Sequence, residues 1–301
     1  MHFLLALLPF VTSAAFCQNI VLTNDDGWAV AQIRAQNNAL IAAGFNVILS
    51  APAENESGTG SKTAIPTTLN QSCEFQTCPT GSPAEGSDPN NPRINYVNAF
   101  PVDAVRFGIQ TLSPQFFGSA PEFVVSGPNV GTNLGTVVLN SGTVGAACEA
   151  AKEGIPSTAF SATSNSQSSF TTLTTDPTSS ASEAAVIYAQ LATSFTQALL
   201  ASPARPILPA NITLNVNLPS TTGCSSASDF QFILTRNIGN SADTDVTTCG
   251  TDHLPDEDTV VTGPGCNIAV SVISALTKTD VDATTQGAVL DRLSDFLSCL
   301  S

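Results

Sequence analysis

The strongest constraint on the fold is an alternation of strand-like and helix-like segments that begins at residue 19. Residues 19–23 (NIVLT) form a short apolar, β-branched run that ends in the turn residues NDDG, which is typical of a buried strand. Residues 33–43 follow a helical pattern closed by Gly44, and residues 45–50 form a second apolar run before Pro52. This strand–helix–strand unit predicts two parallel strands joined by a right-handed crossover.

The alternation continues along the chain and predicts an α/β protein with a mainly parallel sheet. Residues 66–96 are rich in Pro, Ser, Asn and Gly, and we expect them to form an irregular surface insert. Further helices are predicted at residues 103–111, 143–152 and 183–200, and further strands at residues 122–126 and in the runs GIPSTAFS and NITLNVNLP. A last helical stripe is formed by Val289, Leu293, Phe296 and Leu300.

The N-terminus predicts a signal peptide at residues 1–15. An apolar run too short to span a bilayer is followed by Ser13-Ala14-Ala15, which fits cleavage after Ala15. The alternative is a buried first strand. Residues 16–301 are then expected to form one domain of a secreted, extracellular protein without a membrane partner, because no later stretch reads as a membrane helix.

The chain contains eight cysteines, an even number that suits disulfides in an oxidising compartment. Cys73 and Cys78 are close enough in sequence to form a short bridge, whereas Cys148 lies in a helical pattern and is expected to be a small buried apolar group. The remaining pairings stay open. Sequons for N-glycosylation occur at Asn55, Asn70 and Asn211.

The charge balance excludes two classes of partner. The chain has 24 acidic and 9 basic residues and a formal net charge of −15. Nucleic acids need a basic face that neutralises phosphates, and anionic lipids need a basic patch. We therefore expect neither a nucleic-acid duplex nor a membrane surface as partner.

Three polar clusters follow three predicted strands, at residues 24–27 (NDDG), 54–58 (ENESG) and 126–133 (SGPNVGTN). The carboxyl ends of parallel strands meet at one edge of a sheet, where ligands bind. Adjacent carboxylates repel each other unless a cation lies beside them, and oxygen ligands suit Mg²⁺ or Mn²⁺. The alternative is that NDDG is an ordinary turn.

A fourth cluster, Asn140-Ser141-Gly142-Thr143, opens a predicted helix. Free N–H groups at a helix N-terminus form a cradle for anions, and the hydroxyls of Ser141 and Thr143 can add donors. The alternative is an ordinary helix cap. A carboxylate metal centre and an anion cradle at one edge of a sheet together suggest phosphate-ester chemistry.

Six blocks of the sequence resemble the metal-dependent phosphatases and nucleotidases of the survival protein E (SurE) family, and the chain looks like a secreted fungal member. The blocks occur in the family's order within residues 19–275, and FPVDAV lines up with a seventh. They are VLTNDDGWA, APAENESG, VVSGPNVGTNLG, NSGTVGAA, GIPSTAFS and LNVNLP.

The resemblance implies a Rossmann-like three-layer α/β/α sandwich and a secreted phosphomonoester hydrolase that uses a metal-activated water. The substrate would be a small phosphomonoester such as a 5′- or 3′-nucleotide. The implied metal ligands are Asp25, Asp26, Ser57 and Asn129. The implied catalytic and phosphate-holding residues are Asp25, Asn133, Ser141, Gly142 and Thr143. Asp25 is expected to be a ligand and is also a candidate base; association into a homo-oligomer is left open.

Two other functions compete with this one. The first is a secreted phospho-ligand binding module that has the same fold without turnover. The second is a dinucleotide-dependent oxidoreductase, which the sequence disfavours because GxGxxG is missing after the first strand. Lys62 and His253 match no motif and are expected to be surface residues.

Overall fold

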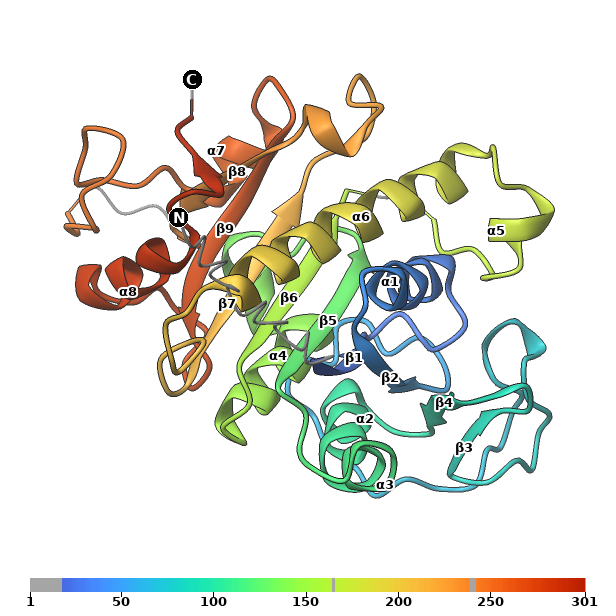
Figure 1. Cartoon of the computed structure of the whole chain (residues 1–301). Coiled ribbons are helices and arrows are strands. Elements are labelled where there is room, and N and C mark those ends of the chain that lie inside the picture. Colours follow the sequence, from blue (N-terminus) through green and yellow to red (C-terminus); the bar gives the residue numbers. More distant parts are fainter. Residues whose placement is uncertain (1–17, 164–165, 239–241, 301) are drawn as a thin grey trace, which may run out of the picture.

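Ten strands of the described residues (18–163, 166–238 and 242–300) form one mixed sheet in this computed structural model, in the order β10-β8-β9-β7-β6-β5-β1-β2-β4-β3 (Figure 1). The strands are β1 (Asn19–Thr23), β2 (Asn46–Pro52), β3 (Glu85–Asp88), β4 (Asn91–Val97), β5 (Phe123–Val130), β6 (Ser157–Ala162), β7 (Ile212–Leu218), β8 (Gln231–Thr235), β9 (Asn267–Ser274) and β10 (Leu297–Ser298). Strands β7, β6, β5, β1, β2 and β4 run parallel, and β3 and β9 pair antiparallel with their neighbours β4 and β7. The predicted α/β class with a mainly parallel sheet is confirmed.

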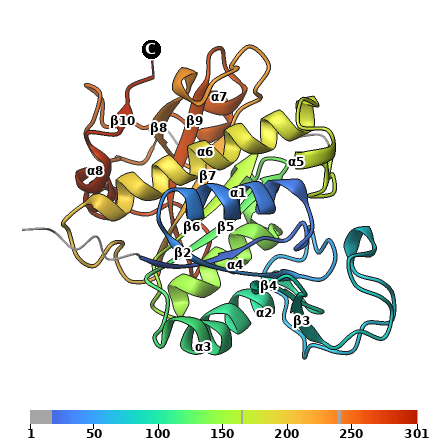
Figure 2. The same ribbon diagram turned by 45° about the vertical axis from the view of Figure 1, so that its right-hand side comes forward.

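Helices cover both faces of this sheet, which gives the three layers. They are α1 (Ala31–Ala42), α2 (Pro101–Phe107), the π-helical turn η2 (Gly108–Leu112), α3 (Ser113–Phe117), α4 (Gly142–Lys152), α5 (Thr172–Thr175), α6 (Ser180–Ala201), α7 (Glu257–Thr262) and α8 (Ala283–Leu293), with short 3₁₀ turns η1 (Glu74–Gln76), η3 (Gly135–Leu139) and η4 (Ala227–Asp229). In β1, Ile20 and Leu22 pack in the core beneath α1 and α6, whereas Val21 packs on the opposite face with residues of α2 and α4. Figure 2 shows α1 and α6 side by side on the same face of the sheet.

Helix α6 confirms the helix predicted at residues 183–200. Its 22 residues are, among the described residues, the one helix long and apolar enough to cross a membrane. However, 56% of its most apolar window is buried inside the protein, and Tyr188, Phe195 and Leu199 lie in the core. Helix α6 is therefore explained as a core helix.

The insert at residues 66–96 is less irregular than predicted. It contains β3 and most of β4, and β4 pairs in parallel with β2 at the edge of the sheet. Ile94, Tyr96 and Val97 of β4 are buried, so the short run INYV is enough to form a strand. The surrounding turn residues hid this run in the sequence.

Three other predicted segments have different ends. Strand 122–126 continues to Val130, so the polar residues that follow its apolar part still belong to β5. The helix predicted at 103–111 begins at Pro101, and helical backbone continues to Phe117. Helix α8 ends at Leu293, and Leu300 of the predicted stripe is 41% exposed, because the chain turns into β10 instead of continuing the helix.

Disulfides pair Cys73 with Cys78, Cys224 with Cys266 and Cys249 with Cys299. The short bridge predicted in the insert is thus present. Cys148 is a buried free cysteine in α4, as predicted. The predicted signal peptide and Cys17 lie outside the described residues.

Candidate active site

The predicted site residues gather where the parallel strands end and α4 begins. Asp25 and Asp26 lie in the turn that follows β1, one residue beyond its end, and both are buried. Asn129 lies in the last part of β5, which pairs with β1. These strands are neighbours in the sheet, so their carboxyl ends share one edge, as the sequence predicts.

Asp25 is held by the N-terminus of α4. The Thr143 N–H donates to Asp25 Oδ2 at 3.0 Å, and the Thr143 hydroxyl donates to Oδ1 at 2.6 Å. A Cβ at Gly142 would lie 2.8 Å from the Asp25 Cβ, so this approach needs a glycine. Ser141 caps the helix by accepting a hydrogen bond from the Val144 N–H.

This arrangement changes the interpretation of the cluster Ser141-Gly142-Thr143. The sequence predicts that these donors hold a phosphate, but here the Thr143 donors and the positive end of the helix hold a carboxylate of the protein itself. Both hydrogen bonds favour the ionised form of Asp25. The structure thus relates Thr143 directly to Asp25, a contact that sequence spacing does not reveal.

Asp26 is fixed from two other segments. The Val130 N–H donates to Asp26 Oδ2 at 2.7 Å, and Gln167 Nε2 donates to Oδ1 at 2.6 Å. Gln167 also accepts a hydrogen bond from Asn55 Nδ2 at 3.0 Å. Gln167 lies outside every matching block, and no signal in the sequence marks it.

The two aspartates have no basic partner among the described residues. Burial raises the pKa of Asp25 above its usual range, against the lowering effect of its bonds to Thr143. Burial and then the Asp25 charge raise the pKa of Asp26 to about 7. No ion pair joins either of them to Lys, Arg or His among the described residues. A cation at this position would lower both pKa values and compensate the buried charge.

Asn129 adds an oxygen without a donor. Asn129 is 7% exposed, its Nδ2 donates to the Gly131 carbonyl at 2.7 Å, and its buried Oδ1 has no hydrogen-bond partner among the described residues. A buried, unpaired oxygen is costly, so it fits a ligand of a hard cation. The described residues hold no metal-binding group of three or more His, Cys, Asp and Glu, so such an ion would also need amide or hydroxyl oxygens.

Ser57 is an exposed residue of the loop after β2, and its neighbour Glu56 binds the backbone of Asp25. The Ser57 N–H donates to Asn55 Oδ1 at 2.8 Å, and the Glu56 N–H donates to the Asp25 carbonyl at 2.7 Å. The loop is therefore attached to the turn that carries the two aspartates. Ser57 is more exposed than the other predicted ligands.

Asn133 is held by the neighbouring strands. Its N–H donates to Asn217 Oδ1 at 2.8 Å and its Nδ2 to Ser161 Oγ at 2.7 Å, while Asn215 Nδ2 donates to its carbonyl at 2.9 Å. Asn215 and Asn217 belong to the predicted strand NITLNVNLP but were not predicted as site residues. Two asparagines spaced two apart in a fully buried strand are a signal that could have identified them.

The insert contributes Glu74, which the sequence also missed. Glu74 is in the loop closed by Cys73 and Cys78, and its N–H donates to the Ala53 carbonyl at 3.0 Å. Its Oε2 is so near Gly27, whose φ is +110°, that a Cβ there would collide with it. Burial and then the Asp26 charge raise the pKa of Glu74 to about 8. Turn residues surround Glu74, so its sequence context resembles a surface loop.

The residues predicted to lie on the surface do so. Lys62 and His253 are exposed, and His253 Nδ1 lies 2.8 Å from Asp252 Oδ1. Neither belongs to the group of residues around Asp25 and Asp26.

Several known proteins resemble this chain in sequence. The model of the family described as survival protein SurE matches residues 20–244. An acid phosphatase of Yarrowia lipolytica is 36% identical over 297 residues, covering 88% of this chain and 80% of that protein. A 5′-nucleotidase SurE of Lawsonia intracellularis is 36% identical over 143 residues, and the matching part is about half of each protein (48% and 50%).

The fold has a solved counterpart. The crystal structure of the SurE protein from Aquifex aeolicus superposes with a TM-score of 0.60 at 21% sequence identity, covering 90% of this chain and 98% of that one. This likeness supports the Rossmann-like sandwich expected from the motifs. The match of the family model over most of the chain, together with the yeast relative, shows that the chain belongs to the SurE family.

Proposed function

We propose that the protein is a secreted, divalent-cation-dependent hydrolase of small phosphomonoesters, such as nucleoside monophosphates. The observation that carries the proposal is the buried pair Asp25 and Asp26, which has hydrogen-bond donors but no basic partner among the described residues. The unpaired Oδ1 of Asn129 supports it. Relatives named acid phosphatase and 5′-nucleotidase support the reaction class.

Asp25, Asp26, Asn129 and Ser57 would hold Mg²⁺ or Mn²⁺, because their oxygens match the ligands these ions prefer. When bound, the cation neutralises phosphate charge and lowers the pKa of a coordinated water. Both Asp25 oxygens accept from Thr143, which fixes the carboxylate. This supports the role of a fixed ligand for Asp25 rather than that of a base.

Asn133 would orient the phosphate. The Thr143 donors are engaged by Asp25, so the helix N-terminus contributes to phosphate binding mainly by fixing that carboxylate. Asn133 is 5% exposed and is held on its backbone and its side chain, which suits a preorganised donor. The net charge of −15 is screened beyond about 8 Å at physiological salt, so local groups decide binding.

Secretion fits the three disulfides of the described residues, since such bonds form and persist in oxidising compartments.

The test is a phosphate-release assay on the purified full chain with p-nitrophenyl phosphate, 5′-AMP, 3′-AMP and polyphosphate. Each substrate is tested with Mg²⁺, with Mn²⁺ and with EDTA between pH 4 and 8. We expect cation-dependent release that EDTA abolishes. Phosphate binding without release would instead establish the inactive binding module, and release unaffected by EDTA would contradict the cation dependence.

A further inference from the structure

A second buried carboxyl group, Glu257, lies outside the residues assigned above. It is the first residue of α7 and is fully buried, with no exposed side-chain surface. Its Oε1 accepts from the Gly135 N–H at 2.7 Å, and its Oε2 accepts from the Ser271 hydroxyl at 2.9 Å. Glu257 therefore contacts the start of the segment that follows Asn133.

The asparagines of β7 connect Glu257 to Asn133. Asn215 Nδ2 donates to Glu257 Oε2 at 3.0 Å and to the Asn133 carbonyl at 2.9 Å. Asn217 Nδ2 lies 3.4 Å from Glu257 Oε2 and donates to the Asn133 carbonyl at 3.2 Å. The Asn217 Oδ1 is then left to accept the Asn133 N–H at 2.8 Å.

The oxygens of Glu257 explain why these amides are oriented as they are. Both side chains present nitrogen to the carboxyl group, and Asn215 does so although its own buried Oδ1 has no partner in the part of the chain that the structure describes. If Asn217 presented its oxygen to Glu257 instead, two acceptors would face each other and the Asn133 N–H would lose its acceptor, which costs about 1–3 kcal/mol for a buried group.

Glu257 also fixes the segment from the other side. With its amide nitrogen turned toward the acceptors, Asn237 donates to Glu257 Oε1 at 2.6 Å and to the Gly135 carbonyl at 3.2 Å. The backbone from Asn133 to Gly135 is thus held at both ends through one carboxyl group.

We propose that Glu257 is a positioning residue that holds Asn133 in its phosphate-contacting position by orienting Asn217 and Asn215 and by binding Gly135. This inference rests on the proposed phosphatase function. It predicts that Glu257 influences phosphate binding and leaves cation binding unchanged, because none of its contacts reaches Asp25, Asp26 or Asn129.

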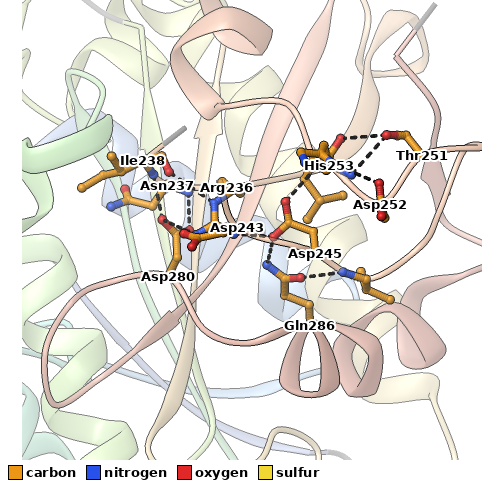
Figure 3. A network of polar contacts seen from close by, with 12 residues as sticks. Arg236, Asn237, Ile238, Asp243, Asp245, Thr251, Asp252, His253, Asp280 and Gln286 are labelled. Carbon is orange, nitrogen blue, oxygen red and sulfur yellow. Dashed lines mark hydrogen bonds and ion pairs between the residues drawn. The ribbon is translucent and has the colours of Figure 1, made fainter. Parts of the chain in front are cut away.

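Asp245 provides a matched control (Figure 3). It is 3% exposed, and it accepts from Arg236, from Gln286 Nε2 at 2.7 Å and from the Leu254 N–H at 2.9 Å. It is therefore a second buried carboxyl group in the same part of the chain. Among the described residues it does not contact the segment from Asn133 to Gly135, and it is connected to Glu257 only through Arg236, whose carbonyl accepts the Glu257 N–H at 2.9 Å. A variant there keeps every side-chain contact of Glu257, so it tests whether lost stability alone weakens phosphate binding.

The experiment is a calorimetric titration of inorganic phosphate into Mg²⁺-saturated wild type, Glu257→Gln and Asp245→Asn, well below their unfolding temperatures. It is done at about pH 9, where Glu257 is ionised although burial raises its pKa to about 8. Gln places an NH₂ donor among donors, so we expect Glu257→Gln to weaken phosphate binding about 10–100-fold, the usual range for residues that orient a ligand-binding group. Its Mg²⁺ affinity should stay within about twofold of wild type. Asp245→Asn should bind phosphate like wild type.

The other outcomes are distinct. Equal phosphate affinity in Glu257→Gln and wild type overturns the positioning role and leaves the proposed function intact. No phosphate binding by wild type overturns the function and this inference with it. Parallel loss of Mg²⁺ and phosphate binding in Glu257→Gln indicates a general structural effect and also overturns the inference.

Asn217→Ala covers the case in which Glu257→Gln does not fold. It removes the acceptor of the Asn133 N–H and keeps the contacts of Glu257 with Gly135 and Ser271. We expect the same selective loss of phosphate affinity, and unchanged phosphate binding would contradict the proposal.

Discussion

Two groups of buried acidic residues in this chain differ in how their charge is compensated. Asp25 and Asp26 at the end of β1 have donors but no basic partner among the described residues. Asp245 and Asp280 lie instead beside Arg236, whose guanidinium is almost fully buried with them (Figure 3). The first group needs a charge from outside the chain, whereas the second carries its own.

The difference separates a binding site from a structural element. In the Arg236 group, Asp280 accepts the Asn237 and Ile238 N–H groups at 2.6 and 2.9 Å, so the ion pair also fixes the backbone. A buried, paired charge of this kind is costly to break. In the Asp25 group, burial raises the pKa values with no basic group among the described residues to offset it, and the Asn129 Oδ1 has no hydrogen-bond partner there. Burial also raises the pKa of Asp280, but Arg236 acts against that shift.

The largest effect should follow from breaking the compensated group. Asp245→Asn removes one of the three ion pairs of the buried Arg236, which keeps Asp243 and Asp280, and should lower the free energy of unfolding by about 1–3 kcal/mol. Asp26→Asn in cation-free protein should cost far less, because it removes an uncompensated charge. Urea unfolding of both variants with EDTA checks the comparison. An equal loss of stability in both would contradict the claim that the two groups differ in how their charge is compensated.

Activity should show the reverse order. Asp26→Asn removes a proposed ligand and should lower kcat/KM for p-nitrophenyl phosphate by at least about 100-fold. Asp245→Asn, assayed at a temperature where it is folded, should stay within a few-fold of wild type. Steady-state kinetics with Mg²⁺ provide the measurement. Full activity of Asp26→Asn would show that Asp26 is not a cation ligand.

The pH dependence of stability should distinguish protein with and without a cation. The pKa is raised to about 7 for Asp26 and to about 8 for Glu74 and Glu257, so the folded state binds more protons than the unfolded state from about pH 4 to 8. Cation-free protein should therefore lose stability as pH rises through this window. We expect a loss of at least about 1 kcal/mol between pH 5 and 8, which lowers the Tm of a chain of this size by about 1.5–2 °C.

Mn²⁺ should reduce this decline, because cations bind the ionised carboxylates. Thermal unfolding at pH 5, 6, 7 and 8 with and without Mn²⁺ tests both statements. A cation-free protein that becomes more stable from pH 5 to 8 would contradict the account of its buried carboxyl groups.

The smallest effect concerns the contact between Asp25 and α4. Thr143→Val removes the hydroxyl donor to Asp25 Oδ1 and should weaken Mn²⁺ binding about tenfold, whereas Thr143→Ser keeps a donor and should restore most of it. Calorimetry compares the two variants. Unchanged Mn²⁺ affinity in Thr143→Val, with weaker phosphate binding, would show instead that Thr143 binds the phosphate, as expected from the sequence.

The sequence predicted the parts of the molecule that depend on local pattern. β1 and α4 follow from apolar periodicity and capping residues. The cluster at Asp25 follows from its position after β1, and Asn129 lies at the carboxyl end of β5, although that strand is longer than predicted. The bond between Thr143 and Asp25 spans 118 positions, and only the packed sheet determines which donor meets which carboxylate. Glu257 lies in an acidic run that reads as a solvated loop, yet it is fully buried.

The most direct test of the central claim is a calorimetric titration of Mn²⁺ into cation-free wild type and Asp26→Asn at pH 6, in two buffers with different ionisation heats. We predict one saturable site in wild type with proton release, because a carboxyl group with a raised pKa must ionise to bind the cation, and little binding in Asp26→Asn. Equal Mn²⁺ affinity in the two proteins would show that the aspartates at the end of β1 do not hold the cation.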